Sequence, residues 1–196
     1  MRRLETRAEK EKKSRRNMFL IGGILIVVMV FGTLAIAFVS RDRYDDQNIE
    51  KIEHNDITFY KRSGFWVFQI NEQIFETRYN PLEIEDIKIM NYQKLGNYNN
   101  QILYTAGDKG DAYIELIKNL IPFIKRTQEA CLPEEDCEGD FPIKNCSIDY
   151  VFIIKKPGDG ETEKFYQEEN CVFIIANYEN QTRYADAFLF DILEIT

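Results

Sequence analysis

The sequence is poor in residues that commonly carry out catalysis or hold metals. It contains one histidine, His54, and four cysteines among 196 residues. No segment matches a zinc-binding H-E-x-x-H pair or a G-x-S-x-G nucleophile turn, and Gly107-x-x-Gly110 lacks the lysine and serine that complete a phosphate loop. We therefore expect no catalytic residue and no cofactor, and we interpret His54 as a surface side chain.

Charge is absent between Met18 and Val39, a run of twenty-two residues. As an α-helix this run would extend about 33 Å, enough to cross the roughly 30 Å hydrocarbon core of a bilayer. Ala35-Ile36-Ala37 resembles a signal-peptide cleavage site, but the apolar part of a signal peptide is only about 7–15 residues long. The sequence therefore predicts an uncleaved signal-anchor, a single transmembrane helix over residues 18–39.

Basic residues gather before this run. Residues 1–17 carry eight Lys/Arg and three Glu, a net charge of +5, which leaves −13 for the rest of a chain whose total is −8. Positive charge concentrates on the cytoplasmic side of a span, so we expect a cytoplasmic tail on anionic lipid and an extracytoplasmic domain at the cell membrane. The acidic domain argues against a nucleic-acid partner, because phosphate binding needs clustered Lys/Arg.

The remaining residues suffice for one folded domain. We expect a juxtamembrane linker at 40–55 and a domain at 56–196, since an aromatic content of 13% argues against disorder. Alternating patterns predict strands at 57–61, 64–70 and 73–79, the last two joined by a two-residue turn. Asn80-Pro81-Leu82-Glu83 has the pattern of a helix N-terminus with a capping box, followed by a single turn through Ile87.

The second half of the domain alternates between strand and helix patterns. We expect a strand at 101–106, a helix at 112–128 that Pro122 kinks or shortens, and a strand at 147–155, together one β-α-β crossover. Apolar residues at helical spacing predict a last helix: Ala185, Phe188, Leu189, Ile192 and Leu193. The predicted fold is α+β, a mixed sheet with helices on one face.

The four cysteines all follow the apolar run. Their spacings include no C-x₂₋₄-C pair, which argues against a structural zinc site, and an even number outside the cytoplasm indicates two disulfides. A hairpin of strands 147–155 and 171–177 around Pro157-Gly158-Asp159-Gly160 would place Phe152 opposite Phe165. Of the three possible pairings of the cysteines, this register favours the one in which Cys146 faces Cys171 and Cys131 pairs with Cys137.

Other candidate sites are weaker. The acidic loop lacks the alternating pattern of a calcium site, and we interpret it as solvated; its members are Glu134, Glu135, Asp136, Glu138 and Asp140. Two asparagines, Asn180 and Asn145, fit the glycosylation pattern, and Asn180 is the better candidate because Asn145 precedes a paired cysteine. Trp66 fits a buried core better than an exposed binding patch.

Several short patterns resemble a group of archaeal membrane-anchored proteins of unknown function. The matching patterns are Phe68-x-x-Asn71-x-x-x-Phe75, Asn80-Pro81-Leu82-Glu83, Asn145-Cys146-Ser147, Glu169-Asn170-Cys171-Val172 and Tyr184-Ala185-Asp186-Ala187-Phe188-Leu189. The resemblance covers most of the external domain. It implies a single membrane span, an extracytoplasmic domain and a pair of cysteines corresponding to Cys146 and Cys171, and it implies no activity.

These observations leave two hypotheses of different class. The first is an interaction or scaffold domain at the outer face of the membrane, part of an envelope or secretion assembly with an envelope protein as partner. The alternative is a membrane-bound ligand-binding protein or hydrolase that uses acidic residues in a cleft. A cleft lined by carboxylates of raised pKa would favour the alternative.

Overall fold

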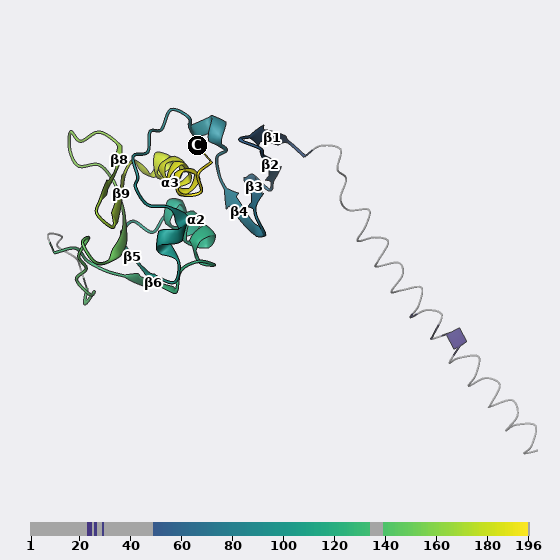
Figure 1. Ribbon diagram of the computed structural model, residues 1–196, viewed down its shortest axis with the longest axis horizontal. Helices are drawn as coiled ribbons and strands as arrows, with labels where there is room; N and C mark the ends of the chain where they lie inside the picture. Colours follow the sequence, from purple (N-terminus) through teal and green to yellow (C-terminus); the bar gives the residue numbers. More distant parts are fainter. Residues whose placement is uncertain (1–22, 25, 27–28, 30–48, 134–138, 196) are drawn as a thin grey trace, which may run out of the picture. The chain divides into compact units, whose positions relative to one another are not determined.

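Two β-sheets enclose a pair of helices in the computed structural model of the protein (Figure 1). The structure describes residues 23–24, 26, 29, 49–133 and 139–195. The chain divides into two units, 1–48 and 49–196, and the fold described below is that of the second unit.

The first sheet is an antiparallel meander in the order β1-β2-β3-β4. Its strands are β1 (Lys51–His54), β2 (Ile57–Arg62), β3 (Phe65–Ile70) and β4 (Gln73–Thr77). The predicted two-residue turn between β3 and β4 is confirmed, because Ile70 pairs with Gln73. Asn71 takes the positive φ of 54° that such a tight turn requires. We did not expect strand β1.

The predicted capping box follows β4. Asn80 Oδ1 accepts hydrogen bonds from the N–H groups of Leu82 and Glu83, at 2.9 and 3.1 Å. Glu83 Oε2 accepts the N–H of Asn80 in return, at 2.8 Å. The turn that they begin is the 3₁₀-helix η1 (Pro81–Ile84), which ends earlier than the expected Ile87.

The second sheet is mixed and has the order β6-β5-β7-β9-β8, preceded in the chain by the 3₁₀-helix η2 (Leu95–Tyr98). Its strands are β5 (Ile102–Gly107), β6 (Arg126–Glu129), β7 (Tyr150–Lys155), β8 (Lys164–Glu168) and β9 (Cys171–Ile175). Neighbouring strands are parallel except for β8 and β9, which are antiparallel.

The helices are α2 (Asp111–Leu120) and α3 (Tyr178–Ile192). We expected the first of them to continue to about residue 128. It ends near Pro122 because proline has no N–H to donate and disfavours helical geometry in the residue before it. The chain then forms β6, a strand that we did not expect. The predicted last helix is confirmed, and it begins earlier than its apolar pattern.

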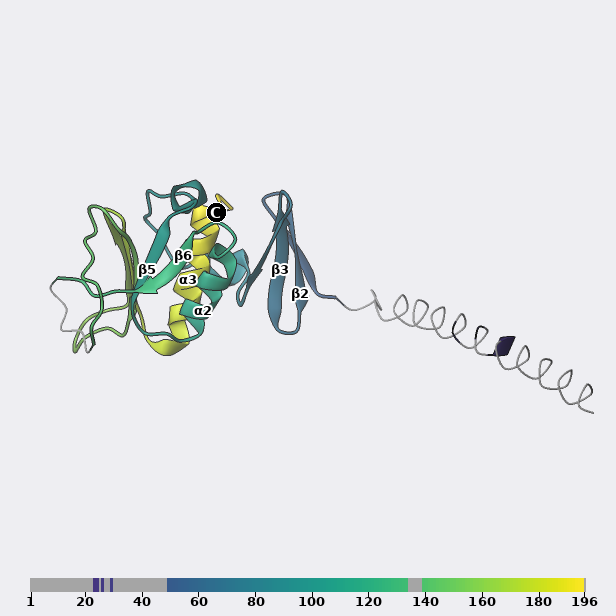
Figure 2. The ribbon, with the colours of Figure 1, turned by 90° about the horizontal axis from the view of Figure 1, so that it is seen from below.

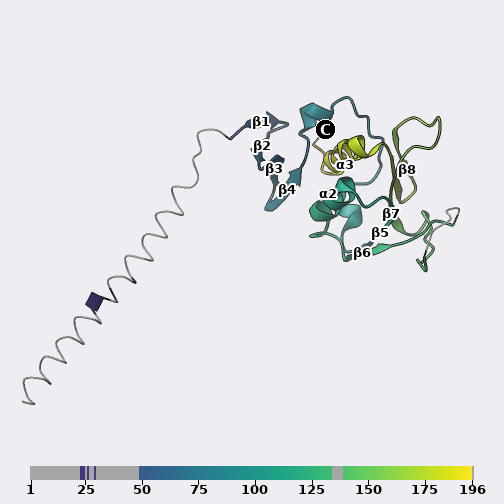
Figure 3. The ribbon, with the colours of Figure 1, turned by 180° about the vertical axis from the view of Figure 1, so that it is seen from behind.

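Both helices lie between the two sheets (Figures 1 and 2), and the view from behind shows the same order of layers (Figure 3). Helix α3 contacts both sheets: Phe188 packs with the core of the second sheet, whereas Phe190 packs with Phe59 and Phe68 of the first. Trp66 is buried in the core of the first sheet, as predicted.

The expected fold class needs two corrections, which concern the membrane span and the number of sheets. No helix among the described residues is long and apolar enough to cross a membrane, and the range 18–39 lies almost wholly outside the described residues. Of the two expected disulfides, Cys146–Cys171 is present between described cysteines. The other expected pair, Cys131 with Cys137, includes a residue outside the described part. The strands form two sheets instead of one mixed sheet.

The predicted hairpin of residues 147–155 and 171–177 is also wrong. Strands β7 and β9 are parallel neighbours, with Val151 opposite Cys171, and β8 lies outside β9 with Phe165 opposite Ile174. The disulfide prediction is nevertheless confirmed for a different reason. Parallel strands start at the same edge of a sheet, so Cys146, which precedes β7, lies beside the start of β9.

Candidate functional site

A cleft lies on the face of the second sheet that is turned away from the helices. Its volume of about 590 Å³ falls within the roughly 300–1,000 Å³ of small-ligand sites. We call it the disulfide cleft, because Cys146 forms part of its wall. The lining residues are Leu132, Pro133, Asn145, Cys146, Ser147, Lys155, Tyr166, Glu168, Glu169 and Phe173.

The wall of the disulfide cleft is held by covalent and hydrogen bonds. The Cα atoms of Cys146 and Cys171 are 5.0 Å apart across the disulfide. The Asn170 N–H donates to the Cys146 carbonyl oxygen at 3.0 Å, and the Val151 N–H donates to the Asn170 carbonyl oxygen at 3.3 Å. The segment before β7 is therefore fixed against the start of β9.

An aromatic pair forms one side of the disulfide cleft. Tyr166 on β8 and Phe173 on β9 are direct cross-strand partners, with ring centroids 4.4 Å apart and ring planes within 4° of parallel. Phe173 is buried, whereas Tyr166 is 36% exposed. A ring held in this way offers a flat apolar surface with a hydroxyl group at its end.

Polar groups complete the rim of the disulfide cleft. Asn145 Oδ1 accepts the N–H of Ser147 at 2.9 Å, and the Ser147 hydroxyl donates to Glu169. Lys155 ends β7 and Glu168 ends β8, the two strands on either side of β9. The lining thus combines donors, acceptors and both signs of charge around an aromatic ring. It contains no histidine, and this chemistry suits binding better than catalysis.

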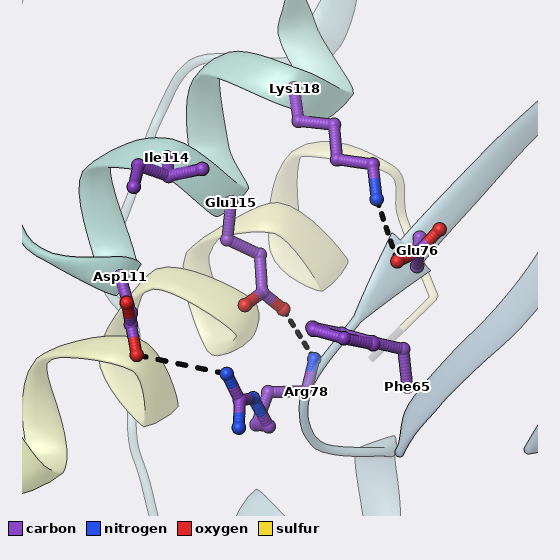
Figure 4. A pocket seen from close by; sticks show the side chains of 7 residues that line it. All are labelled: Phe65, Glu76, Arg78, Asp111, Ile114, Glu115 and Lys118. Carbon is purple, nitrogen blue, oxygen red and sulfur yellow. Dashed lines mark hydrogen bonds and ion pairs between the residues drawn. The ribbon is translucent and has the colours of Figure 1, made fainter. Parts of the chain in front are cut away.

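A second hollow, of about 130 Å³, lies between α2 and β4 (Figure 4). Ion pairs join Arg78 to Asp111 at 3.7 Å and Lys118 to Glu76 at 2.6 Å. Both cations lie over the ring of Phe65, at 4.8 and 5.6 Å from its centroid. The charged groups at the mouth of this hollow are thus already paired with one another.

Helix side chains close the outer edge of β4. Asn119 Nδ2 donates to the Glu76 carbonyl oxygen at 2.7 Å, and Asn119 Oδ1 accepts the Glu76 N–H at 2.9 Å. The Arg78 N–H donates to Glu115 Oε1, as Figure 4 shows. The Tyr79 N–H donates to Asp186 Oδ2 at 2.9 Å. Amide and carboxyl groups from α2 and α3 thus take the place of a further strand.

The carboxyl groups of Glu115 and Asp186 accept the N–H groups of two successive residues, Arg78 and Tyr79, and are close enough to influence each other's pKa. Their side chains are buried, with 6% and 1% of the residue exposed. Burial raises the pKa of Glu115 above its usual range and that of Asp186 well above it, because an ionised carboxylate loses its hydration there. We call these two residues the acid pair.

A third hollow, of about 260 Å³, is largely apolar and contains the only histidine. Ile84, Ile87 and Phe190 form part of its wall, and His54 and Asp191 lie among its polar groups. Across the described residues, no group of three or more His, Cys, Asp or Glu side chains is placed to hold a metal ion. Four members of the acidic loop, Glu134 to Asp136 and Glu138, lie outside the described residues.

The two candidate glycosylation sites differ in their surroundings. The side-chain amide of Asn180 donates to Glu163 at 2.8 Å, and Thr182, which completes its pattern, is buried in α3. Asn145 and Ser147 are exposed at the rim of the disulfide cleft. The geometry therefore favours Asn145 over Asn180, opposite to the order that the sequence favoured, and both remain predictions.

We did not predict the acid pair or Asn119. A signal for them exists: Glu115 and Asn119 are four residues apart on α2, and Asp186 stands between two buried alanines on α3. Polar side chains at such positions are buried only when they have hydrogen-bond partners. Their partners are backbone groups of β4, whose position relative to the helices no local pattern reveals.

Comparison of the chain with protein-family models, curated proteins and solved structures yields no match.

Proposed function

We propose that residues 49–196 form an extracytoplasmic interaction domain that binds another protein of the cell envelope through the disulfide cleft. The disulfide supports the compartment, because such bonds persist in oxidising environments and are rare in the cytosol. The basic residues of 1–17 and the uncharged run that follows support a place at the cell membrane.

The exposed ring of Tyr166 is the observation that carries this proposal. It rests on a buried phenylalanine, so its orientation is set before a partner arrives and little conformational entropy is lost on binding. Tyrosines of this kind are enriched among the residues that dominate protein interfaces. The surrounding carboxylates and Lys155 provide the polar rim that such interfaces usually have.

In-cell photo-crosslinking tests the proposal. A photoreactive phenylalanine analogue replaces Tyr166 in the full-length chain, and the products are recovered from the membrane fraction and identified by mass spectrometry. We expect one reproducible protein adduct. Tyr166→Ala should then weaken co-purification of that protein by about tenfold or more, in line with the roughly 2 kcal/mol of a dominant interface residue.

Tyr178 provides the matched control, because it is also an exposed tyrosine but lies at the start of α3, outside the disulfide cleft. The same analogue at Tyr178 should give no adduct with that protein. Equal adducts from both positions, or none from Tyr166, would contradict binding through the cleft. Recovery of the chain in the soluble fraction would contradict its place at the membrane.

A hydrolase that uses acidic cleft residues has less support. Glu115 is the one residue of raised pKa that lines the hollow between α2 and β4, and it is almost wholly buried. Asp186 is not among the residues that line this hollow. One oxygen of each carboxyl group already accepts a backbone N–H. A general acid or base must reach its substrate within hydrogen-bond distance. The burial and existing hydrogen bonds of these two carboxyl groups prevent a substrate from coming that close.

A further inference from the structure

The carboxyl oxygens of the acid pair outnumber the hydrogen-bond donors that contact them. One oxygen of each carboxyl group accepts a backbone N–H, from Arg78 or from Tyr79. The other oxygen of Asp186, Oδ1, is buried and accepts no hydrogen bond from any N–H or O–H of the described residues. The neighbouring polar group is the Glu115 carboxyl, which has no hydrogen to donate unless it is protonated.

Within the described part of the chain, no ion pair joins a cation to the acid pair. On α2, Lys118 pairs with Glu76 and Asp111 pairs with Arg78, which follows β4. On α3, Arg183 pairs with Asp86, beyond η1. Arg78 and Lys118 attract Glu115, but burial and the mutual repulsion of two carboxylates act in the opposite direction. With both carboxyl groups ionised, two negative charges would lie in contact, away from water.

We propose that Glu115 and Asp186 form a binding site for one proton, which holds the first sheet against both helices. The bound proton lies between Glu115 and Asp186 and completes their hydrogen bond. When it is lost at high pH, the two carboxylates repel each other. They then release the backbone of Arg78 and Tyr79, so the end of β4 separates from α2 and α3.

The sign of the pH dependence follows from proton counting. In the unfolded chain, Asp and Glu lose their protons near their usual pKa values of about 3.9 and 4.3. The folded chain keeps one proton above that range. Contact between β4 and the helices is therefore strongest at low pH. Above about pH 4 the equilibrium constant for this contact falls about tenfold for each pH unit. The fall ends when the folded acid pair releases its own proton.

Hydrogen exchange on the full-length chain measures this directly. The protection factors of the Arg78 and Tyr79 amides, corrected for the intrinsic pH dependence of exchange, should fall with pH between about 5 and 8.5. In Glu115→Gln and in Asp186→Asn an amide N–H replaces the shared proton, so the fall should disappear. Infrared spectra of the wild type at neutral pH should contain a protonated carboxyl band, absent in the double variant Glu115→Gln/Asp186→Asn.

Asp111→Asn is the control, since Asp111 is an exposed acid of the same hollow and lies outside the acid pair. In this variant the protection factors of the Arg78 and Tyr79 amides should keep the wild-type pH dependence. A wild-type profile that is flat across the pH range would overturn the proposal without any variant. So would a pH dependence that persists in both single amide variants, or the absence of a protonated carboxyl band at neutral pH.

Discussion

The two sheets are attached to the same helices by different chemistry. The second sheet meets α2 and α3 through apolar side chains and is tied at its far face by the Cys146–Cys171 disulfide. The first sheet also packs on α3 through apolar side chains such as Phe190, but the edge of β4 is held in addition by Asn119 and by the acid pair. Attachment through carboxyl groups depends on protons, whereas attachment through hydrocarbon does not.

The largest change in the free energy of unfolding is expected for two phenylalanines of α3. Phe188 and Phe190 are both fully buried, but Phe188 packs on Phe152 of the second sheet and Phe190 packs on Phe59 of the first. Replacement of either by alanine should lower the free energy of unfolding by about 3–5 kcal/mol, measured by urea unfolding of the full-length chain. Hydrogen exchange should show Phe190→Ala loosening the first sheet and Phe188→Ala the second.

Tyr178→Ala, an exposed aromatic change on the same helix, should alter the free energy of unfolding by less than about 0.5 kcal/mol. If both phenylalanine variants loosened both sheets equally, the sheets would be one cooperative unit, and the comparison between them would fail.

Removal of the disulfide should have a somewhat smaller effect, confined to the second sheet. The bond closes a loop with a sequence separation of 25. By the chain-entropy relation, the double change Cys146→Ser/Cys171→Ser should therefore lower the free energy of unfolding by about 3.5 kcal/mol. Urea unfolding with and without a reducing agent provides the measurement. An equal loss of amide protection in β2 and β3 would contradict confinement to the second sheet.

The smallest effect is expected at Asn119. Asn119→Ala leaves the N–H and carbonyl groups of Glu76 without their partner, at a cost of about 1–3 kcal/mol, because that backbone is partly buried. Lys118→Ala, one residue away, removes a partly exposed ion pair and should cost less than about 1 kcal/mol. Both values come from urea unfolding. Equal costs for the two variants would mean that Asn119 does not close the edge of β4.

Much of the first sheet could be predicted from sequence because its contacts are local. The alternation of Trp66 and Phe68 with outward residues identifies β3, and the turn at Asn71 determines its partner. The capping box at Asn80 and Glu83 is likewise complete within four residues. Patterns of this kind decide structure over a few residues, and the structure agrees with them.

The strand order of the second sheet could not be predicted in the same way. The turn pattern at residues 157–160 marks a reversal of the chain but does not determine which strand pairs with which. Strand β8 has the alternating exposure of an edge strand, whereas every residue of β9 is buried. An uninterrupted apolar run such as Cys171 to Ile175 is typical of a parallel strand covered on both faces. That signal favours a central place for β9 over a hairpin with β7.

The acid pair was beyond sequence reasoning for a related reason. Glu115 and Asp186 are remote in the chain, and their other partners are backbone groups of residues 78 and 79, which carry no side-chain signal. The disulfide cleft combines segments that are remote in the sequence and that meet through the pairing of β9 with β7 and β8. Sites built from non-local pairing become visible only when the topology is known.

The only tryptophan of the chain provides a spectroscopic reporter that needs no label. Trp66 is 1% exposed in the first sheet, and its indole N–H donates to Glu83 at 3.0 Å. Exposure of this indole to water would shift its fluorescence emission to longer wavelengths, whereas the second sheet has no tryptophan to respond. Emission recorded together with circular dichroism would therefore distinguish the opening of one sheet from the loss of both.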